Sequence, residues 1–461
     1  MPPKKSTAAT KKSAKTEGKE ATKTAKTEGT KEAAAKTLKA SSLGCCCTFC
    51  SILVALLSVL VMVVYKGWLV RLGMLQWIDN WDPQGRGLRW RGETPWLVPK
   101  PWLFTEADIQ RVDGQVVIVT GANSGLGYWT ARHLAMRGAL VIMACRDEAK
   151  CEAAAKHIID AAPQRFKRRP SSFKGDVMPK VLDLSNLSSV SAFAAEVEHV
   201  TSRLDSLVLN AGVMFRPWDL SADGIESTFA TNHVGHHLLA KLLLPLLQKT
   251  ASKHGVATVS VASSAAAYET VAAGEAGIQL DYYLQRHSVG SVGSAASAGS
   301  TAASKSQQAS TPPEWFDSFE AYCQSKLANI LFAQQLSEVA RADGHNVLVN
   351  AWAPGAVFTN LLNHVIGPGE ELEAKLVPSL GPSAASSARE AVVWALGQLV
   401  WHPRDASLTQ VYTAIGKVVR EANTTGRYFQ SVAREQAPDP HCRNKTLQLL
   451  LWQKTEALIA G

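Results

Sequence analysis

The chain has 461 residues, of which 46% are apolar and 19% are charged, and these values exclude a protein that is disordered throughout. Eight cysteines in this length exclude a small disulfide-built scaffold. The net charge of +9 is concentrated at the start, because residues 1–40 hold 11 lysines and 4 glutamates and leave +2 for the other 421 residues. The charge therefore belongs to a tail, and the body of the protein is nearly neutral.

Residues 1–41 contain little that a folded core could bury, so they are predicted to form a disordered Lys-rich tail. Such a tail is either simply solvated or contacts an acidic membrane surface or nucleic acid. The solvated interpretation is favoured, because no aromatic side chain is available to stack on a base.

A charge-free apolar stretch follows, from Leu43 to Tyr65. As a helix it would rise about 35 Å, enough to cross a hydrocarbon core, so residues 42–65 are predicted to form one transmembrane helix. The long region before it argues against a cleaved signal peptide, and a buried core helix seldom needs so many consecutive apolar residues. Flanking lysines favour a cytosolic N-terminus by a thin margin. Four cysteines at its start are either palmitoylation sites or merely apolar: Cys45, Cys46, Cys47 and Cys50.

Residues 66–111 form a Trp-rich juxtamembrane segment. Its rings could lie in the headgroup layer, where an apolar ring and a wet N–H are both satisfied, or could pack against the following domain. The tryptophans are Trp68, Trp77, Trp81, Trp90, Trp96 and Trp102.

Residues 112–461 are predicted to form one catalytic domain that begins with a strand, a glycine-rich turn and a helix. The β-branched run Val116–Thr120 predicts a buried parallel strand, and the turn 121–127 carries three glycines. Glycines let the backbone approach a pyrophosphate, whose charge is then stabilised by the helix N-terminus. The second strand, Leu140–Cys145, is followed by Arg146 rather than by an acid. A guanidinium suits a ribose 2′-phosphate and favours NADP(H) over NAD(H), unless Arg146 is a surface charge paired with Asp147.

Further strands are predicted at 181–184, 206–210 and 258–264, each separated from the next by helical sequence. This alternation predicts an α/β fold with a Rossmann-type doubly wound parallel sheet, and such sheets bind ligands beyond the carboxyl ends of their strands.

The chemistry is expected at four separated positions. Tyr322 and Lys326 are four residues apart and would share one face of a helix. A neighbouring ammonium favours the phenolate, so we expect it to lower the pKa of the phenol. Ser264 ends a strand, and Asn232 lies in the helical stretch 229–237.

From about Val112 to the end, the sequence resembles the short-chain dehydrogenase/reductase superfamily, in its retinol dehydrogenase-like branch. The motifs that carry the resemblance are TGANSGLG at 120–127, ACRD at 144–147, DL at 183–184, NAGV at 210–213, TNHVG at 231–235, YCQSKLAN at 322–329, PG at 354–355 and GRYF at 426–429.

The resemblance implies a role for each matched residue. Tyr322 would donate and accept the proton, while Lys326 would lower its pKa and bind the nicotinamide ribose. Ser264 would hold the substrate oxygen, and Asn232 would anchor a water in a proton relay. The implied cofactor-binding residues are Gly121, Asn123, Ser124, Gly125, Leu126, Gly127, Arg146, Asp183, Leu184, Asn210, Ala211, Gly212, Tyr322, Lys326, Pro354, Gly355 and Thr359. No metal site is predicted.

The expected function is therefore that of a membrane-anchored NADP(H)-dependent oxidoreductase that interconverts a carbonyl and an alcohol on a lipophilic substrate such as a retinoid or a steroid. A single-pass protein of the endoplasmic reticulum or another endomembrane is expected, with no nucleic-acid partner and with a homodimer left open. The alternative is a non-catalytic, cofactor-binding interaction protein on the same fold.

Two features depart from the family pattern. Ser264 and Tyr322 are separated by a Ser/Ala/Gly-rich stretch, read as a flexible insertion at about 285–314. Ala353 stands before Pro354, where many relatives carry His, which alters the wall of the site.

Overall fold

The computed structural model describes residues 104–161, 177–268, 270, 277–287, 312–342, 344–355, 357, 401–438 and 440–461. The expected tail, transmembrane helix, juxtamembrane tryptophans and the centre of the insertion lie outside these ranges. None of the helices in the described ranges is both long enough and apolar enough to cross a bilayer.

Within the described ranges, eight strands form one sheet in the order β3-β2-β1-β4-β5-β6-β7-β8, parallel from β3 to β7 and antiparallel between β7 and β8. The chain first adds β2 and β3 on one side of β1 and then adds β4 on the other side of β1. The direction of winding therefore reverses between β1 and β4. The strands are β1 Val116–Thr120, β2 Leu140–Cys145, β3 Val177–Val181, β4 Ser206–Leu209, β5 Ala257–Ala262, β6 Val347–Trp352, β7 Tyr428–Gln430 and β8 Arg434–Gln436.

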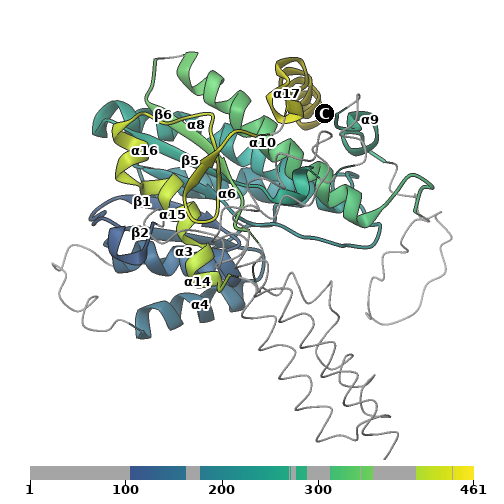
Figure 1. Cartoon of the computed structure of the whole chain (residues 1–461). Coiled ribbons are helices and arrows are strands. Elements are labelled where there is room, and N and C mark those ends of the chain that lie inside the picture. The colour runs from purple at the N-terminus through teal and green to yellow at the C-terminus, as the bar shows by residue number, and fades with distance from the viewer. Residues whose placement is uncertain are drawn as a thin grey trace, which may run out of the picture. The chain divides into compact units, whose positions relative to one another are not determined.

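Helices cover both faces of the sheet (Figure 1). Alternate residues of β1 enter different cores, with Val116 and Ile118 on one face and Val117 and Val119 on the other. The first core includes α6 Leu187–Val200, α8 Gly235–His254, α10 Ser318–Ala342 and α17 Lys445–Ala460, and the second includes α3 Gly125–Met136, α4 Glu148–Asp160 and α15 Leu408–Ile415. The shorter helices are α7 Ser227–Phe229, α9 Leu280–Tyr283, α14 Pro403–Ala406 and α16 Lys417–Glu421.

The predicted Rossmann-type parallel sheet is confirmed, and the bounds of β1 and β2 are those predicted. The prediction of a third strand at 181–184 is wrong, because the structure places β3 at Val177–Val181. Among the described strands it pairs only with β2, and it contains Pro179, which cannot donate a ladder hydrogen bond and is therefore tolerated at an edge.

Because the strands are parallel, the loops after β1, β2, β4, β5 and β6 all leave the sheet at the same side. We call this side the carboxyl edge. Ligands of doubly wound sheets bind there, next to the reversal of winding between β1 and β4.

Candidate active site

The glycine loop lies between β1 and α3 and packs closely on the loop after β4. A Cβ on Gly127 would lie 2.4 Å from the carbonyl oxygen of Gly121 and 2.5 Å from Nδ2 of Asn210, so no larger residue fits. Gly121 also has a left-handed φ of +65°. The glycines thus leave the backbone at the N-terminus of α3 without side chains that would cover it.

The first turn of α3 is open to an anion. Ser124 is the N-cap residue, but its side chain accepts no hydrogen bond from the helix within the described residues. The N-terminal N–H groups of the helix therefore keep their capacity to bind a pyrophosphate. Asn123 and Leu126 are half-buried beside them, and Gly125 begins the helix with a φ of +53°.

Asn210 joins β4 to β1 directly below this loop. Its Nδ2 donates to the carbonyl oxygen of Thr120 at 2.8 Å, while the N–H groups of Asn210 and Ala211 each donate to Thr120 Oγ1 at 2.9 Å. These bonds fix the spacing of the two strands at the reversal of winding.

Arg146 follows β2 directly and is exposed. Asp147 pairs with Lys150 at 3.0 Å and caps α4 by accepting from the Lys150 N–H at 3.0 Å. In the part of the chain that the structure describes, Arg146 makes no hydrogen bond or salt bridge within 4 Å. The pKa of the Asp147 carboxyl is lowered first by its hydrogen bonds from Lys150 and least by the charge of Arg146, so Lys150 is the main partner of Asp147 and Arg146 a weaker one. The adjacent Cys145 forms a disulfide with Cys151, with a Cα–Cα distance of 5.9 Å. The sequence did not indicate this bond.

Asp183 and Leu184 follow β3 at the same edge. Asp183 Oδ1 accepts from the backbone N–H and the hydroxyl of Ser185, at 2.9 and 2.6 Å. Leu184 is buried, and a Cβ on Gly235 would lie 2.1 Å from its carbonyl oxygen. Gly235 therefore allows α8 to pack tightly against this loop.

Ser264, Tyr322 and Lys326 come together although 58 positions separate the serine from the tyrosine. Ser264 leaves the end of β5, and its side chain is hydrogen-bonded to that of Tyr322 near the start of α10. Nζ of Lys326 lies 5.5 Å from the centre of the Tyr322 ring, on the same helix face. Ser263 ties the two elements together, because its Oγ donates to the carbonyl oxygen of Lys326 at 2.7 Å.

Burial controls the acid–base character of this pair. Tyr322 is 6% exposed and Lys326 is 4% exposed. Burial raises the pKa of Tyr322 to about 12, against a lowering by the Ser264 hydrogen bond, and burial lowers the pKa of Lys326 to about 8. The expected lowering of the tyrosine pKa by the neighbouring ammonium is not found, because desolvation is the largest influence on this phenol and the charge of Lys326 is not among the causes of the shift. Tyr322 is therefore a protonated donor at neutral pH.

The residues of this edge fit a nicotinamide ribose. Within the described residues, the Lys326 ammonium has no hydrogen-bond acceptor, which is unusual for a buried amine. A Cβ on Gly212 would lie 3.3 Å from Lys326 Nζ and 3.3 Å from Asn232 Oδ1, so glycine keeps the space beside both groups open. A ribose hydroxyl is the type of acceptor that this amine lacks.

Asn232 holds the turn after β4 next to these groups. Its Oδ1 accepts from the Val213 N–H at 2.8 Å, and its Nδ2 donates to the Val213 carbonyl oxygen and to Ser325 Oγ, both at 2.9 Å. It lies in a π-helical turn, residues 230–234, rather than in the regular helix expected. Such turns are frequent at functional sites.

Comparison with known proteins agrees with the Rossmann-type fold and with the arrangement of the site. The short chain dehydrogenase family pattern matches residues 115–274. Human retinol dehydrogenase 13 is 32% identical over 348 residues, which cover 76% of this chain and 85% of that protein, and mouse retinol dehydrogenase 14 is 33% identical over 75% and 86%. The chain belongs to the short-chain dehydrogenase/reductase family. It is an oxidoreductase similar to the retinol dehydrogenases, on a fold that binds nicotinamide cofactors.

A crystal structure of an uncharacterized protein from Mycobacterium paratuberculosis is also similar to this dehydrogenase. It is 28% identical with a TM-score of 0.49 and covers 78% of this chain and 98% of its own.

Not every predicted site residue is within reach of the structure. Pro354 and Gly355 follow β6 at the carboxyl edge, half-buried, with Gly355 at a φ of +73°. Thr359 and residues 288–311 of the insertion lie outside the described residues. The predictions for these parts therefore stay predictions.

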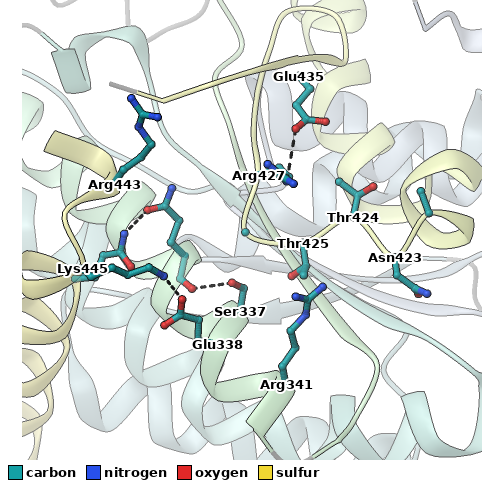
Figure 2. A pocket seen from close by; sticks show the side chains of 14 residues that line it. Ser337, Glu338, Arg341, Asn423, Thr424, Thr425, Arg427, Glu435, Arg443 and Lys445 are labelled. Carbon is teal, nitrogen blue, oxygen red and sulfur yellow. Dashed lines mark hydrogen bonds and ion pairs between the residues drawn. The ribbon is translucent and has the colours of Figure 1, made fainter. Parts of the chain in front are cut away.

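A polar pocket of about 500 Å³ lies at the other end of α10 in this dehydrogenase (Figure 2). Arg341 lines it, 19 helical residues and about 28 Å from Tyr322. Ion pairs cross or flank it, between Lys445 and Glu338 and between Arg427 and Glu435. None of the predicted catalytic or cofactor residues lines this pocket, so it is distinct from the site at the carboxyl edge.

Proposed function

We propose that the protein is a membrane-anchored, NADP(H)-dependent reductase that converts a lipophilic aldehyde or ketone, such as a retinoid or a steroid, into the alcohol. The observation that carries the proposal is the arrangement of a protonated Tyr322, hydrogen-bonded to Ser264, beside the buried Lys326 amine that has no acceptor among the described residues.

The residues of the chain would divide the reaction between binding and proton transfer. The glycine loop and the N-terminus of α3 would hold the pyrophosphate, and Lys326 would bind the nicotinamide ribose. When bound, the nicotinamide supplies the hydride. Ser264 would orient the carbonyl oxygen, and Tyr322 would give that oxygen its proton.

Burial keeps the Tyr322 phenol protonated near neutral pH, which is the form that the reduction of a carbonyl requires. A phenol with a pKa of about 12 holds its proton below that pH and can donate it. Oxidation of an alcohol needs the phenolate instead, and its fraction grows only as the pH rises.

The preference for NADP(H) rests on Arg146. It stands where dinucleotide sites that prefer NAD(H) place an acid, and Asp147 is already paired with Lys150. An exposed guanidinium that makes no hydrogen bond in the described residues is suited to a 2′-phosphate.

The membrane anchor and the endomembrane location rest on the charge-free stretch 42–65 of the sequence. A lipophilic substrate dissolved in the bilayer would be concentrated near an enzyme held there. The similarity to retinol dehydrogenases agrees with a substrate of that kind.

The test uses full-length protein in liposomes with NADPH deuterated at C4 and a panel of carbonyls that includes all-trans-retinal. We expect deuterium in the product alcohol and a kcat/KM at least about tenfold higher with NADPH than with NADH. Failure to transfer deuterium to any carbonyl would favour the non-catalytic, cofactor-binding alternative.

A further inference from the structure

A buried histidine connects the proposed proton relay with the strand that carries the glycine loop. His236, the second residue of α8, is 1% exposed. Its Nε2 lies 2.9 Å from Thr120 Oγ1, and its Nδ1 lies 3.0 Å from the carbonyl oxygen of Asn232. The imidazole therefore touches the last residue of β1 on one side and the relay asparagine on the other.

The hydrogen bonds of Thr120 determine the tautomer of His236. A hydroxyl accepts with two lone pairs and donates one proton. Both lone pairs of Thr120 Oγ1 are used by the N–H groups of Asn210 and Ala211. The proton of Thr120 must be donated, and His236 Nε2 at 2.9 Å is a nearer acceptor than the Val208 carbonyl at 3.5 Å.

It follows that Nε2 is unprotonated and that Nδ1–H donates to the Asn232 carbonyl oxygen. A neutral ring is consistent with its surroundings, because burial, opposed by the hydrogen bond to the Asn232 carbonyl and aided by the charge of Lys326, lowers the pKa of His236 to about 4. The ring therefore stays neutral, with Nδ1 as the donor to Asn232 and Nε2 as the acceptor from Thr120.

The carbonyl that His236 contacts belongs to the residue that faces Lys326. The Asn232 side chain is committed to Val213 and Ser325, so its position is already fixed by the turn after β4. The Nδ1–H bond adds a fixed donor to its backbone carbonyl, inside a π-helical turn where the regular backbone register is interrupted.

We propose that His236 is a positioning residue of the proton relay, which holds the Asn232 carbonyl in place and ties it through Thr120 to the strand that carries the glycine loop. This inference rests on the proposed function, because the relay serves the transfer of a proton by Tyr322. His236 touches neither substrate nor cofactor in this role, and it acts through Asn232.

Two amide substitutions separate the two bonds of the ring. In His236→Asn the amide reaches the position of Nδ1 and keeps the donor to the Asn232 carbonyl. In His236→Gln the amide reaches the position of Nε2, keeps the contact with Thr120 and loses that donor. Each substitution removes one bond and leaves a polar group of similar burial.

We expect kcat for retinal reduction by the full-length protein to be about tenfold lower in His236→Gln, the effect of losing one hydrogen bond in the transition state, and distinctly higher in His236→Asn than in His236→Gln. The KM for NADPH should change by less than about twofold in both. The pH dependence of kcat should shift in His236→Gln only, since the relay and not the cofactor site is disturbed.

His237 gives the matched control. It is equally buried and one residue further on, but its Nε2 bonds Glu456 at 2.7 Å and its ring lies 4.4 Å from the ring of Trp452 of α17, tilted by 49°. His237→Gln should leave the pH profile of kcat as in the wild type, whatever it does to the melting temperature.

Equal losses in both His236 variants, or a shifted pH profile in the His237 control, would overturn the positioning role while the proposed function stands. A wild type without turnover would overturn the proposed function and this inference together. If His236→Gln does not fold, ¹⁵N NMR of histidine-labelled wild type still decides, because a proton on Nε2 of His236 contradicts the tautomer and a proton on Nδ1 supports it.

Discussion

The buried amine of Lys326 should lower the unfolding free energy of the protein, and its removal should raise that free energy again. Lys326 is 4% exposed, its amine has no hydrogen-bond acceptor among the described residues, and burial lowers its pKa from 10.5 to about 8. The difference corresponds to about 3 kcal/mol of unfolding free energy at neutral pH, where the unfolded chain is charged without penalty. Lys326→Met keeps the length and helix propensity of the side chain but removes the charge.

The sign of the pH dependence follows from proton binding. Between pH 8 and pH 10.5 the unfolded chain still binds a proton that the folded protein has released, so the unfolding free energy of the wild type rises with pH across this window. The Lys326→Met variant lacks this contribution. Its advantage over the wild type should be largest, about 3 kcal/mol, below pH 8 and should vanish above pH 10.5.

Chemical denaturation of both proteins without cofactor, in one detergent and at intervals from pH 6 to pH 10.5, measures this difference. Lys249→Met removes one exposed lysine from α8 and serves as the control for net charge, with an expected change below about 0.5 kcal/mol. A variant that is no more stable than the wild type at pH 7, or whose advantage does not depend on pH, would refute the reasoning. The same variant should have lost its reductase activity.

Three further outcomes are expected. Arg146→Asp should change the NADPH to NADH preference in kcat/KM by at least about tenfold toward NADH, measured by absorbance at 340 nm, and an unchanged ratio would contradict the cofactor assignment. Gly127→Ala should abolish NADPH binding in a fluorescence titration, because its Cβ would meet Gly121 and Asn210, whereas unchanged affinity would show that the loop can relax. Deletion of residues 1–66 should move the protein from the membrane to the soluble fraction after centrifugation, and retention would locate the anchor elsewhere.

The sequence predicted best where burial is uniform. All residues of β1 are buried, as are all but the first of β2, and such strands are continuous apolar runs with clear ends. Edge strand β3 is half-buried and contains Pro179 and Lys180, so its pattern gave no run to recognise, and the prediction moved to the residues that follow it.

The residues of the candidate site could be predicted from the sequence, but the direction of the pKa shift of Tyr322 could not. The order of the motifs selected Tyr322, Lys326, Ser264 and Asn232 across a long insertion, and the structure brings the serine and the tyrosine into hydrogen-bond contact. The sign of the tyrosine pKa shift depends on how much water the fold removes, which sequence spacing does not contain.

Particular side-chain contacts also could not be predicted from the sequence. Thr120 and His236 are 116 positions apart, and nothing in either local pattern indicates that they meet. The disulfide between Cys145 and Cys151 joins the end of β2 to α4, and the spacing of the two cysteines has no meaning until that strand and helix are packed together.

Transfer of a proton by Tyr322 is tested most directly by a single-turnover reduction of retinal with deuterated NADPH, comparing the wild type with Tyr322→Phe at equal cofactor occupancy. The substitution removes only the phenolic hydroxyl that Ser264 contacts. We predict that the rate of deuteride transfer falls by about 10²- to 10⁴-fold while NADPH still binds. Transfer at the wild-type rate by Tyr322→Phe would contradict the assignment of this residue as the proton donor.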